Sequence, residues 1–369
     1  MYQRPDGLWT AQVTLPNGKR KTKYGKSQKL VRDWLHEQQN SVRQGAWTDS
    51  ASVTVKDFLE RYRSDVVAHT LRPKTQETYN IIISNHLIPA LGKVRLAALR
   101  PDHLQSLYSE KLTGGYSRRT VVYIHAVMHK ALTHAVKWGL VVRNVADAVE
   151  VPRPEKKPPE LLTEGQARAF LEAVKEHFLY ALYVTAITTG MRKGEILGLR
   201  WSDVNLDAGI IQVNQVALSV YKKGTILSEP KTEKSRRSID LPTITVEALK
   251  QHKLKQDVIR ASRSKWADND LVFPTKNGTP IGSRNIYKYF QEALEKAGLP
   301  KVTFHSLRHL HSTLLLIAGI HPKIVQERLG HSRIDITMDI YSHVIPGMQK
   351  PAAATMDKVL GTAPAATTA

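Results

Sequence analysis

The chain contains no cysteine in its 369 residues, which excludes disulfide bridges and metal sites built from thiolates. It also has no apolar run close to the roughly 20 residues that cross a bilayer. Arg4, Asp6 and Lys19 interrupt the start of the chain, so we expect no secretory signal peptide. We see no internal repeat. These absences predict a soluble, cytoplasmic protein with no membrane partner, and the length suggests two or three domains.

Acidic residues are also in short supply. The sequence has 33 Asp and Glu against 54 Lys and Arg, which gives a formal net charge of +21 and a pI of about 9.9. Such an excess of positive charge is typical of a protein that binds a polyanion. Ribosomal proteins and proteins of membrane surfaces share it, so charge alone favours nucleic acid without excluding those classes.

Residues 302–343 carry polar side chains at fixed spacing inside a helical apolar pattern. His305 and Arg308 are three residues apart, so on a helix they share one face. A guanidinium held in place can grip a phosphate with two parallel N–H bonds, and a nearby imidazole can donate or accept a proton. The leucines around this pair predict a buried helix that shows one polar edge to a cleft.

The same stretch continues with two further polar signals. We expect a helix from Pro322 to Leu329 that ends on a left-handed Gly330, with His331 held directly after this cap. Ser332 is suited to cap the next short helix, which carries Tyr341. The alternative is a packed helical bundle in which these side chains are incidental. One H-x-x-R is common, but the series H-x-L-R-H, L-G-H-S and then a tyrosine is not common by chance.

This series resembles the C-terminal signature of the tyrosine recombinase (phage integrase) family. Residues 189–195 read T-G-M-R-K-G-E and are similar to the family pattern T-G-[LM]-R-x-[GS]-E around its first arginine. The resemblance therefore implies a catalytic role for Arg192. Glu195, one turn further on, is placed to orient that guanidinium, because an unpaired buried charge is costly. The alternative for these two residues is a structural ion pair.

The family also has a lysine on a mobile β-hairpin. Residues Ile210–Tyr221 alternate like one strand, and Arg236–Leu241 is expected to pair back against it. In the polar turn between them, Lys231 in P-K-T fits the family lysine best. Lys234 is its rival.

By this resemblance, the catalytic set is Arg192, Lys231, His305, Arg308, His331 and Tyr341. The tyrosine would attack the phosphate that the two arginines clamp, and His305 would take or return the tyrosine proton. Lys231 would protonate the departing 5′ oxygen, and His331 would hydrogen-bond the phosphate. The implied product is a 3′-phosphotyrosine, which conserves the bond energy and needs no ATP. The sequence shows no Walker loop and no acidic metal cluster, so we expect no cofactor and no metal.

Residues 1–48 predict a small sheet backed by one helix. Strands are expected at Leu8–Thr14 and Lys19–Tyr24 around a tight Pro-Asn-Gly turn, and Ser27 is suited to cap a helix that runs to about Arg43. The sheet looks short of a first strand. It resembles the arm-type DNA-binding domain of many integrases, and a basic ribbon can enter a major groove. A solvated basic hairpin is the alternative. The candidate DNA contacts share one strand face and are Lys19, Lys21 and Lys23.

Residues 53–148 predict an all-α domain of four or five helices. We expect helices at Thr75–His86 and Ser117–Trp138, with a break at Pro89–Gly92. The domain resembles the core-binding domain that grips the far side of the duplex in this family. Three histidines, at positions 125, 129 and 134, lack a carboxylate at ligand spacing, so no metal site is predicted. Candidate phosphate contacts are Lys74, Arg118, Arg119 and Lys130.

A proline-stiffened linker, residues 149–162, separates this domain from a mixed α+β catalytic domain at residues 163–347. Thr163 and Gln166 predict a capping box at its first helix, and the segment at about Tyr180–Thr188 is apolar almost all round. The tail, residues 348–369, could form a short helix only at Thr355–Leu360. The predicted fold class is thus multidomain and mainly α, with small β elements.

The predicted function is site-specific recombination that integrates or excises a mobile element such as a prophage. The implied partners are double-stranded DNA, through core and arm sites, three further copies of the chain in a homotetramer, and possible DNA-bending accessory factors in a bacterial nucleoid. Two rival classes remain. A catalytically silent DNA-binding regulator would share the fold, but all six polar positions are present. A type IB topoisomerase would share the chemistry, but the N-terminal arm and the integrase-like middle domain disfavour it.

Overall fold

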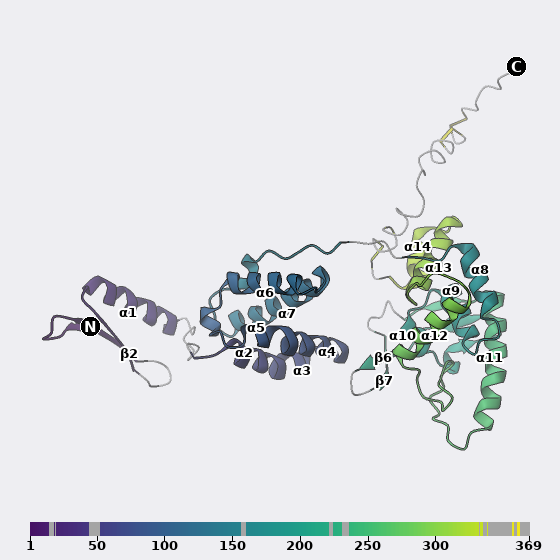
Figure 1. Cartoon of the computed structure of the whole chain (residues 1–369), viewed down its shortest axis with the longest axis horizontal. Coiled ribbons are helices and arrows are strands. Elements are labelled where there is room, and N and C mark those ends of the chain that lie inside the picture. Colours follow the sequence, from purple (N-terminus) through teal and green to yellow (C-terminus); the bar gives the residue numbers. More distant parts are fainter. Residues whose placement is uncertain are drawn as a thin grey trace. The chain divides into compact units, whose positions relative to one another are not determined.

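A computed structural model describes most of the chain, and Figure 1 shows its elements. The described residues are 1–14, 18, 20–43, 52–155, 160–220, 224–230, 236–331, 333–334, 338, 356–357 and 360–361. The chain divides into two compact units, residues 1–157 and residues 158–369. None of the described helices is both long and apolar enough to span a bilayer. The predicted fold class, mainly helical with several domains and small β elements, is confirmed.

The first unit begins with a three-stranded antiparallel sheet of order β1-β2-β3, on which a helix packs. The expectation that the sheet lacks a first strand is wrong, because Tyr2 pairs with Thr10 and Gln3 with Trp9. A strand of two residues is too short to show an alternating pattern in the sequence. The turn that brings β1 against β2 is closed by backbone hydrogen bonds from the Gly7 N–H to the Arg4 carbonyl and from the Arg4 N–H to the Leu8 carbonyl. The elements are β1 (Tyr2–Gln3), β2 (Trp9–Thr14), β3 (Arg20–Gly25) and α1 (Gln28–Arg43).

A helical bundle with its own apolar core makes up the rest of this unit. Thr54 caps the first helix through a reciprocal capping box with Asp57, and Ser117 caps the long helix that begins at Arg118 by accepting from the Thr120 backbone N–H. The helices are α2 (Val55–Tyr62), η1 (Arg63–Val67), α3 (Ala68–Thr70), α4 (Pro73–Ile82), η2 (Ile83–Leu87), α5 (Ile88–Leu91), η3 (Leu96–Ala98), α6 (Pro101–Thr113), α7 (Arg118–Lys137) and η4 (Val145–Ala148), of which η1 and η2 are π-helical turns.

The predicted break at Pro89–Gly92 is displaced. Helix α4 begins at Pro73, earlier than expected, and continues through the π-helical turn η2 into α5, which contains Pro89. Pro89 is tolerated because it lies in the first turn of α5, directly after a segment whose hydrogen bonds have already changed from the α pattern. The helical run ends only at Gly92.

The second unit contains seven α-helices and two small sheets among its described residues. The predicted capping box of Thr163 and Gln166 is confirmed at the start of its first helix. The helices are α8 (Glu164–Ala173), α9 (Tyr180–Thr189), α10 (Lys193–Leu197), η5 (Trp201–Asp203), α11 (Thr243–Ala261), α12 (Ser283–Lys296), α13 (Ser306–Ile317) and α14 (Pro322–Leu329). The strands are β4 (Val204–Asn205), β5 (Ile210–Gln212), β6 (Val216–Val220), β7 (Gly224–Ser228) and β8 (Ser238–Asp240).

The prediction of one strand across Ile210–Tyr221 is wrong. This segment divides into β5, which pairs with β4 and β8, and β6, which pairs with β7 in a separate hairpin. Two polar side chains cause the division. Asn214 Nδ2 donates to Asp203 Oδ1 at 2.8 Å, and Gln215 Nε2 donates to the Gly198 carbonyl at 3.0 Å. These bonds hold the backbone between the two strands, which an alternating pattern cannot reveal.

Helix α9 lies at the centre of the second unit. Nearly all its side chains are buried, as its apolar sequence predicts, and both α11 and α13 pack on it. It ends at Gly190, which has a left-handed conformation with φ of 63°. A Cβ atom at Gly190 would lie 2.5 Å from His311 Cδ2 and 2.5 Å from Leu329 Cδ2. Glycine is therefore required both by the backbone conformation and by the close approach of α13 and α14.

We expect Gly190→Ala to lower the free energy of unfolding by roughly 3 kcal/mol, because the left-handed conformation and the two close contacts both disfavour a methyl group. Gly165→Ala is the matched control. Gly165 lies in the first turn of α8 with open space around it, so alanine there should stabilise by up to about 1 kcal/mol. Thermal unfolding of the full-length chain provides the comparison. Equal unfolding midpoints for the two variants would contradict this account of how α9 ends.

Candidate active site

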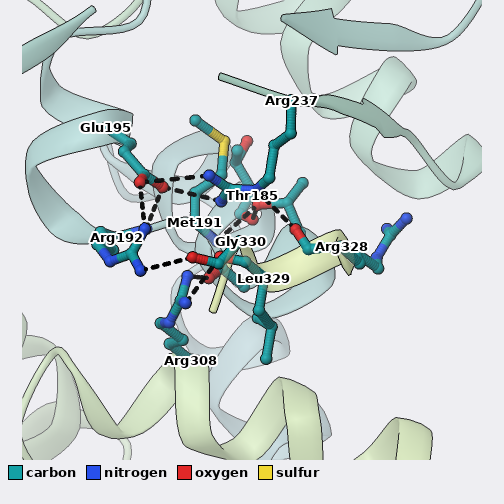
Figure 2. Close-up of polar contacts among 11 residues, drawn as sticks. Thr185, Met191, Arg192, Glu195, Arg237, Arg308, Arg328, Leu329 and Gly330 are labelled. Carbon is teal, nitrogen blue, oxygen red and sulfur yellow. Dashed lines mark hydrogen bonds and ion pairs between the residues drawn. The ribbon is translucent and has the colours of Figure 1, made fainter. Parts of the chain in front are cut away.

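Three successive backbone carbonyls at the end of α14 each accept a hydrogen bond from a different arginine (Figure 2). The last carbonyls of a helix have no partner within the helix, and they form the negative end of its dipole. Cations are therefore favoured at this position. The three pairs are Arg237 Nε with the carbonyl of Arg328 at 2.7 Å, Arg308 Nη2 with that of Leu329 at 2.8 Å, and Arg192 Nη2 with that of Gly330 at 3.0 Å.

Arg308 is the most deeply buried of the predicted catalytic residues that the structure describes, with 4% of its surface exposed. Its second hydrogen bond, from Nη1 to the Gly190 carbonyl at 2.7 Å, joins α13 to the end of α9. Among the described residues, no carboxylate forms an ion pair with it. Burial, followed by the charge of Arg192, lowers the pKa of Arg308 to about 9, while Glu195 opposes this. The side chain remains charged at neutral pH, and an anion bound beside it would be stabilised.

Arg192 is the N-cap residue of α10 and is held at two points by Glu195. Its backbone N–H donates to Glu195 Oε2 at 2.8 Å, and its Nη1 donates to Oε1 at 2.8 Å. The Arg192 side chain is 39% exposed, whereas that of Glu195 is only 3% exposed. The carboxylate is thus buried beneath the guanidinium and fixes its direction, and the outer side of the guanidinium stays open to solvent.

A second arginine on Glu195 was missed from the sequence. Arg237 donates to both carboxylate oxygens, from Nη1 at 3.3 Å and from Nη2 at 2.9 Å. Burial alone would raise the pKa of Glu195, but the hydrogen bond and charge of Arg237 and the charge of Arg192 outweigh it and hold that pKa below its usual value. The only sequence signal was a pair of basic residues at 236 and 237 before a short strand, which is typical of surface charge.

Arg328 and His311 fix the other side of α14. Arg328 donates to the carbonyls of Asp240 at 2.9 Å and Thr188 at 3.1 Å, and its Nε contacts His311 Nε2 at 3.3 Å. His311 Nδ1 lies 2.9 Å from the Ile187 carbonyl. Since Nδ1 must donate to that carbonyl and Nε2 must accept from Arg328, His311 is the neutral tautomer with its proton on Nδ1. Burial, followed by the charge of Arg328, lowers its pKa to about 4.

The two predicted catalytic histidines lie at the open side of this cluster. His305 precedes α13 at an exposed position, and its ring stands edge-on to that of His309 at 4.9 Å. Burial of the ring lowers the pKa of His305, and the adjacent His309 and the charge of Arg308 lower it further. The side chain lies at the exposed rim of the site, where solvent weakens these effects. His331 directly follows the left-handed Gly330, as predicted. Its partial burial and the charges of Arg308 and Arg192 lower its pKa to about 3.

This arrangement is suited to bind an anion that carries several oxygen atoms. A guanidinium has five N–H donors, and Arg192 and Arg308 each use two Nη atoms on described carbonyl or carboxylate groups. Donors therefore remain on both for a ligand. The carbonyls satisfy hydrogen bonds without cancelling charge, and among the described residues the carboxylate of Glu195 pairs with Arg192 and Arg237 but not with Arg308. The site keeps an excess of positive charge, beside two histidines that are neutral at pH 7.

Three residues of the prediction lie outside the described part of the chain. They are Lys231, its rival Lys234, and the proposed nucleophile Tyr341. Ser332 also lies outside it, and of the helix that it was expected to cap only Arg333, Ile334 and Met338 are described, with the Met338 N–H donating to the Ile334 carbonyl at 2.9 Å. The structure therefore brings together Arg192, Glu195, His305, Arg308 and His331, and the assignments of the lysine and the tyrosine remain predictions.

The candidate DNA contacts of the first unit are exposed where they are described. Lys74 pairs with Glu77 at 2.8 Å, and Arg118 pairs with Glu155 at 3.5 Å. On β3, Lys21 and Lys23 stand opposite Val13 and Ala11, which are buried. Directly opposite residues share one face of a sheet, so both lysines project from the edge of the face that α1 covers. Arg119 and Lys130 lie on α7, and Lys19 is outside the described residues.

Two of the three histidines on α7 that were considered for a metal site have protein partners. His125 Nδ1 lies 3.1 Å from the Tyr108 hydroxyl, and His129 Nε2 lies 2.7 Å from Asp147 Oδ1. Across the part of the chain that the structure describes, no group of three or more His, Asp or Glu side chains is arranged to hold a metal ion.

Comparison with known proteins agrees with this geometry. The pattern of the phage integrase family matches residues 160–347, and that of a phage integrase N-terminal SAM-like domain matches residues 54–112. The chain is 30% identical to a "Tyrosine recombinase XerC-like" protein of Caldanaerobacter subterraneus subsp. tengcongensis, over 92% of this chain and 93% of that one.

Two solved structures share the fold. One is the Tn1549 transposon integrase in complex with transposon right end DNA, with a TM-score of 0.71 and 22% identity, covering 84% of this chain and 100% of that one. The other is a lambda integrase tetramer bound to a Holliday junction, with a TM-score of 0.56 and 18% identity, covering 92% and 93%. The chain therefore belongs to the phage integrase family and is a tyrosine site-specific recombinase.

Proposed function

We propose that this recombinase cuts and rejoins DNA at one phosphate held between Arg192 and Arg308, with Tyr341 as the nucleophile. The observation that carries the proposal is the anchoring of both guanidiniums on neighbouring carbonyls at the end of α14, with His331 next in the chain. Rigid donors of this kind stabilise charge that develops on the non-bridging oxygens of a phosphate without reorganising during the reaction. The excess of positive charge at this arginine cluster also attracts the negatively charged DNA backbone.

The proposed reaction begins when the Tyr341 oxygen attacks the phosphorus and the bond to the 5′ oxygen breaks. A tyrosine hydroxyl has an ordinary pKa of about 10, so it needs a proton acceptor and nearby cations. His305 is neutral at pH 7 because its pKa is lowered, and a neutral imidazole can accept that proton. His331, also neutral, can donate one N–H to a non-bridging oxygen.

Lys231, or its rival Lys234, would give a proton to the departing 5′ oxygen. The 3′-phosphotyrosine then stores the energy of the broken ester, and a 5′ hydroxyl from the partner strand reverses the reaction. Exchange of the attacking strand makes the product a recombinant duplex. Integration or excision of a mobile element is the outcome we propose.

The partners follow from the reaction. Recombination joins two duplexes that are each cut on both strands, so it uses four tyrosines, and one chain supplies one Tyr341. We therefore propose a homotetramer on double-stranded DNA, with residues 1–48 on separate arm sites and 53–148 on the core site. The Tn1549 and lambda integrases were solved with DNA, the latter as a tetramer, which supports this proposal. We assign residues 348–369 as the link between protomers, and DNA-bending accessory factors as further partners.

We expect Tyr341→Phe to abolish strand cleavage and to leave binding of the site within a few-fold, because only the hydroxyl is removed. The assay uses a duplex that carries the attachment site and a nick near the cleavage point, so that the short fragment diffuses away and the covalent complex accumulates. Wild-type protein should give a slowly migrating protein–DNA band on a denaturing gel. A covalent band of undiminished intensity from the phenylalanine variant would place the nucleophile elsewhere. Binding without cleavage by wild-type protein would favour the silent regulator.

Arg192→Lys and Arg308→Lys should each reduce the rate of cleavage about 100- to 1,000-fold, because an ammonium cannot contact a phosphate and a backbone carbonyl in the geometry of the guanidinium. Arg168→Lys is the control, since Arg168 pairs with Glu164 on the exposed surface of α8. Its rate should equal that of wild type. Single-turnover cleavage of the nicked duplex provides the measurement, and near-normal rates for both site variants would show that these arginines only support the fold.

Two truncated chains test the proposed partners. A chain that starts near residue 50 should still cleave a short core duplex but should integrate poorly, because it lacks the arm-binding residues. A chain that ends near residue 348 should bind core DNA but should not assemble four protomers, as measured by the mass of the complex on DNA. Undiminished integration by the first chain would contradict an arm domain, and a normal tetramer from the second would rule out the tail as the link.

A further inference from the structure

Arg237 is held in place by the backbone before its side chain makes any contact. It stands directly before β8, and its carbonyl accepts a hydrogen bond from the Val213 N–H at 2.9 Å, which extends the pairing of β5 with β8. Its side chain is 7% exposed. Because the side chain is buried and its backbone is held in the sheet, the guanidinium has little conformational freedom. The sheet therefore sets its direction.

The Arg237 side chain connects the two halves of the site (Figure 2). Nη1 and Nη2 donate to the Glu195 carboxylate, which holds Arg192 at the start of α10. Nε donates to the Arg328 carbonyl at the end of α14, three residues before His331. In return, Arg328 donates to the Asp240 carbonyl at the end of β8. The strand and the helix are thus joined by two arginines that point in opposite directions.

Arg237 also lies close in sequence to both candidate lysines. Residues 231–235, which include Lys231 and Lys234, end two residues before it. The three hydrogen bonds of the Arg237 guanidinium given above are all made to protein groups, so we expect its effect on the phosphate to pass through Arg192 and His331.

We propose that Arg237 is a positioning residue for strand cleavage, which sets the spacing between Arg192 and His331 through Glu195 and the end of α14. This inference rests on the proposed function, because it assumes cleavage at that site. A positioning role differs from a general role in stability because it also predicts a change in the pH dependence of cleavage. Arg237 lowers the pKa of Glu195, and the ionised carboxylate accepts the two hydrogen bonds of Arg192 more strongly than the neutral acid.

The test compares Arg237→Lys and Arg237→Gln with Arg200→Lys in the full-length chain. Arg200 is the matched control, because it donates to Asp203 from Nε at 2.6 Å and from Nη2 at 3.1 Å in the same unit and has no bond to the α14 carbonyls among its described contacts. The measurements are the single-turnover cleavage rate of the nicked duplex across pH, the affinity for the same duplex, and the thermal unfolding midpoint.

We expect both Arg237 variants to bind DNA within a few-fold of wild type and to cleave about 100-fold more slowly, the loss typical of catalytic groups displaced by about 1 Å. The acid side of the rate profile should move to higher pH, because Glu195 without Arg237 keeps its proton at higher pH and then releases Arg192. Arg200→Lys should leave both the rate and the profile unchanged. A glutamine variant slower than the lysine variant would agree with a role for charge.

Three results would overturn the inference. The first is a rate within a few-fold of wild type with an unchanged pH profile. The second is a loss of rate that Arg200→Lys shares and that the unfolding midpoint explains. The third is failure of both Arg237 variants to fold, which would make the residue structural. Failure of the proposed function would be recognised separately, because wild-type protein would then give no covalent complex.

Discussion

The active site depends on the unpaired carbonyls at the end of one short helix. Helix α14 must end with free carbonyls, and Gly330 in the left-handed conformation turns the chain so that three of them face arginines from three other segments. A carboxylate in this place would also accept hydrogen bonds from the arginines, but it would cancel their positive charge. Carbonyls satisfy the hydrogen bonds and leave the charge, so the folded protein holds a cationic site ready for a phosphate.

The same arrangement explains why the histidines are neutral in the protein without DNA. Burial lowers the pKa of both imidazoles, and each also lies close to arginine charges that lower it further. A bound phosphate brings negative charge to the same place, and negative charge raises the pKa of an imidazole. We therefore expect DNA binding to raise the proton affinity of His305 and His331, in the direction that their proposed roles as general base and hydrogen-bond donor require. The buried arginines hold the elements of the site together and also lower the pKa values of its two histidines.

Local sequence patterns predicted the parts of this site that depend on neighbours in the chain. Arg192 with Glu195, His305 with Arg308, and the cap at Gly330 are all separated by a few residues, and helical geometry fixes their relation. Arg237 was missed because its partners are 42 and 91 residues away, at Glu195 and Arg328. The strand at Ile210–Tyr221 was mispredicted for a similar reason. Asn214 and Gln215 interrupt it through bonds to groups that only the folded chain brings near, and β1 is too short for any pattern.

The identity of the nucleophile is the claim that the rest of the mechanism depends on, and it can be measured directly. The covalent complex formed with a nicked attachment-site duplex is digested with protease and nuclease, and the peptide that retains a nucleotide is sequenced by mass spectrometry. The account predicts a single modified peptide, with the phosphate on the Tyr341 oxygen and attached to the 3′ end of the cut strand. A phosphate on any other residue, or attachment through a 5′ end, would contradict it.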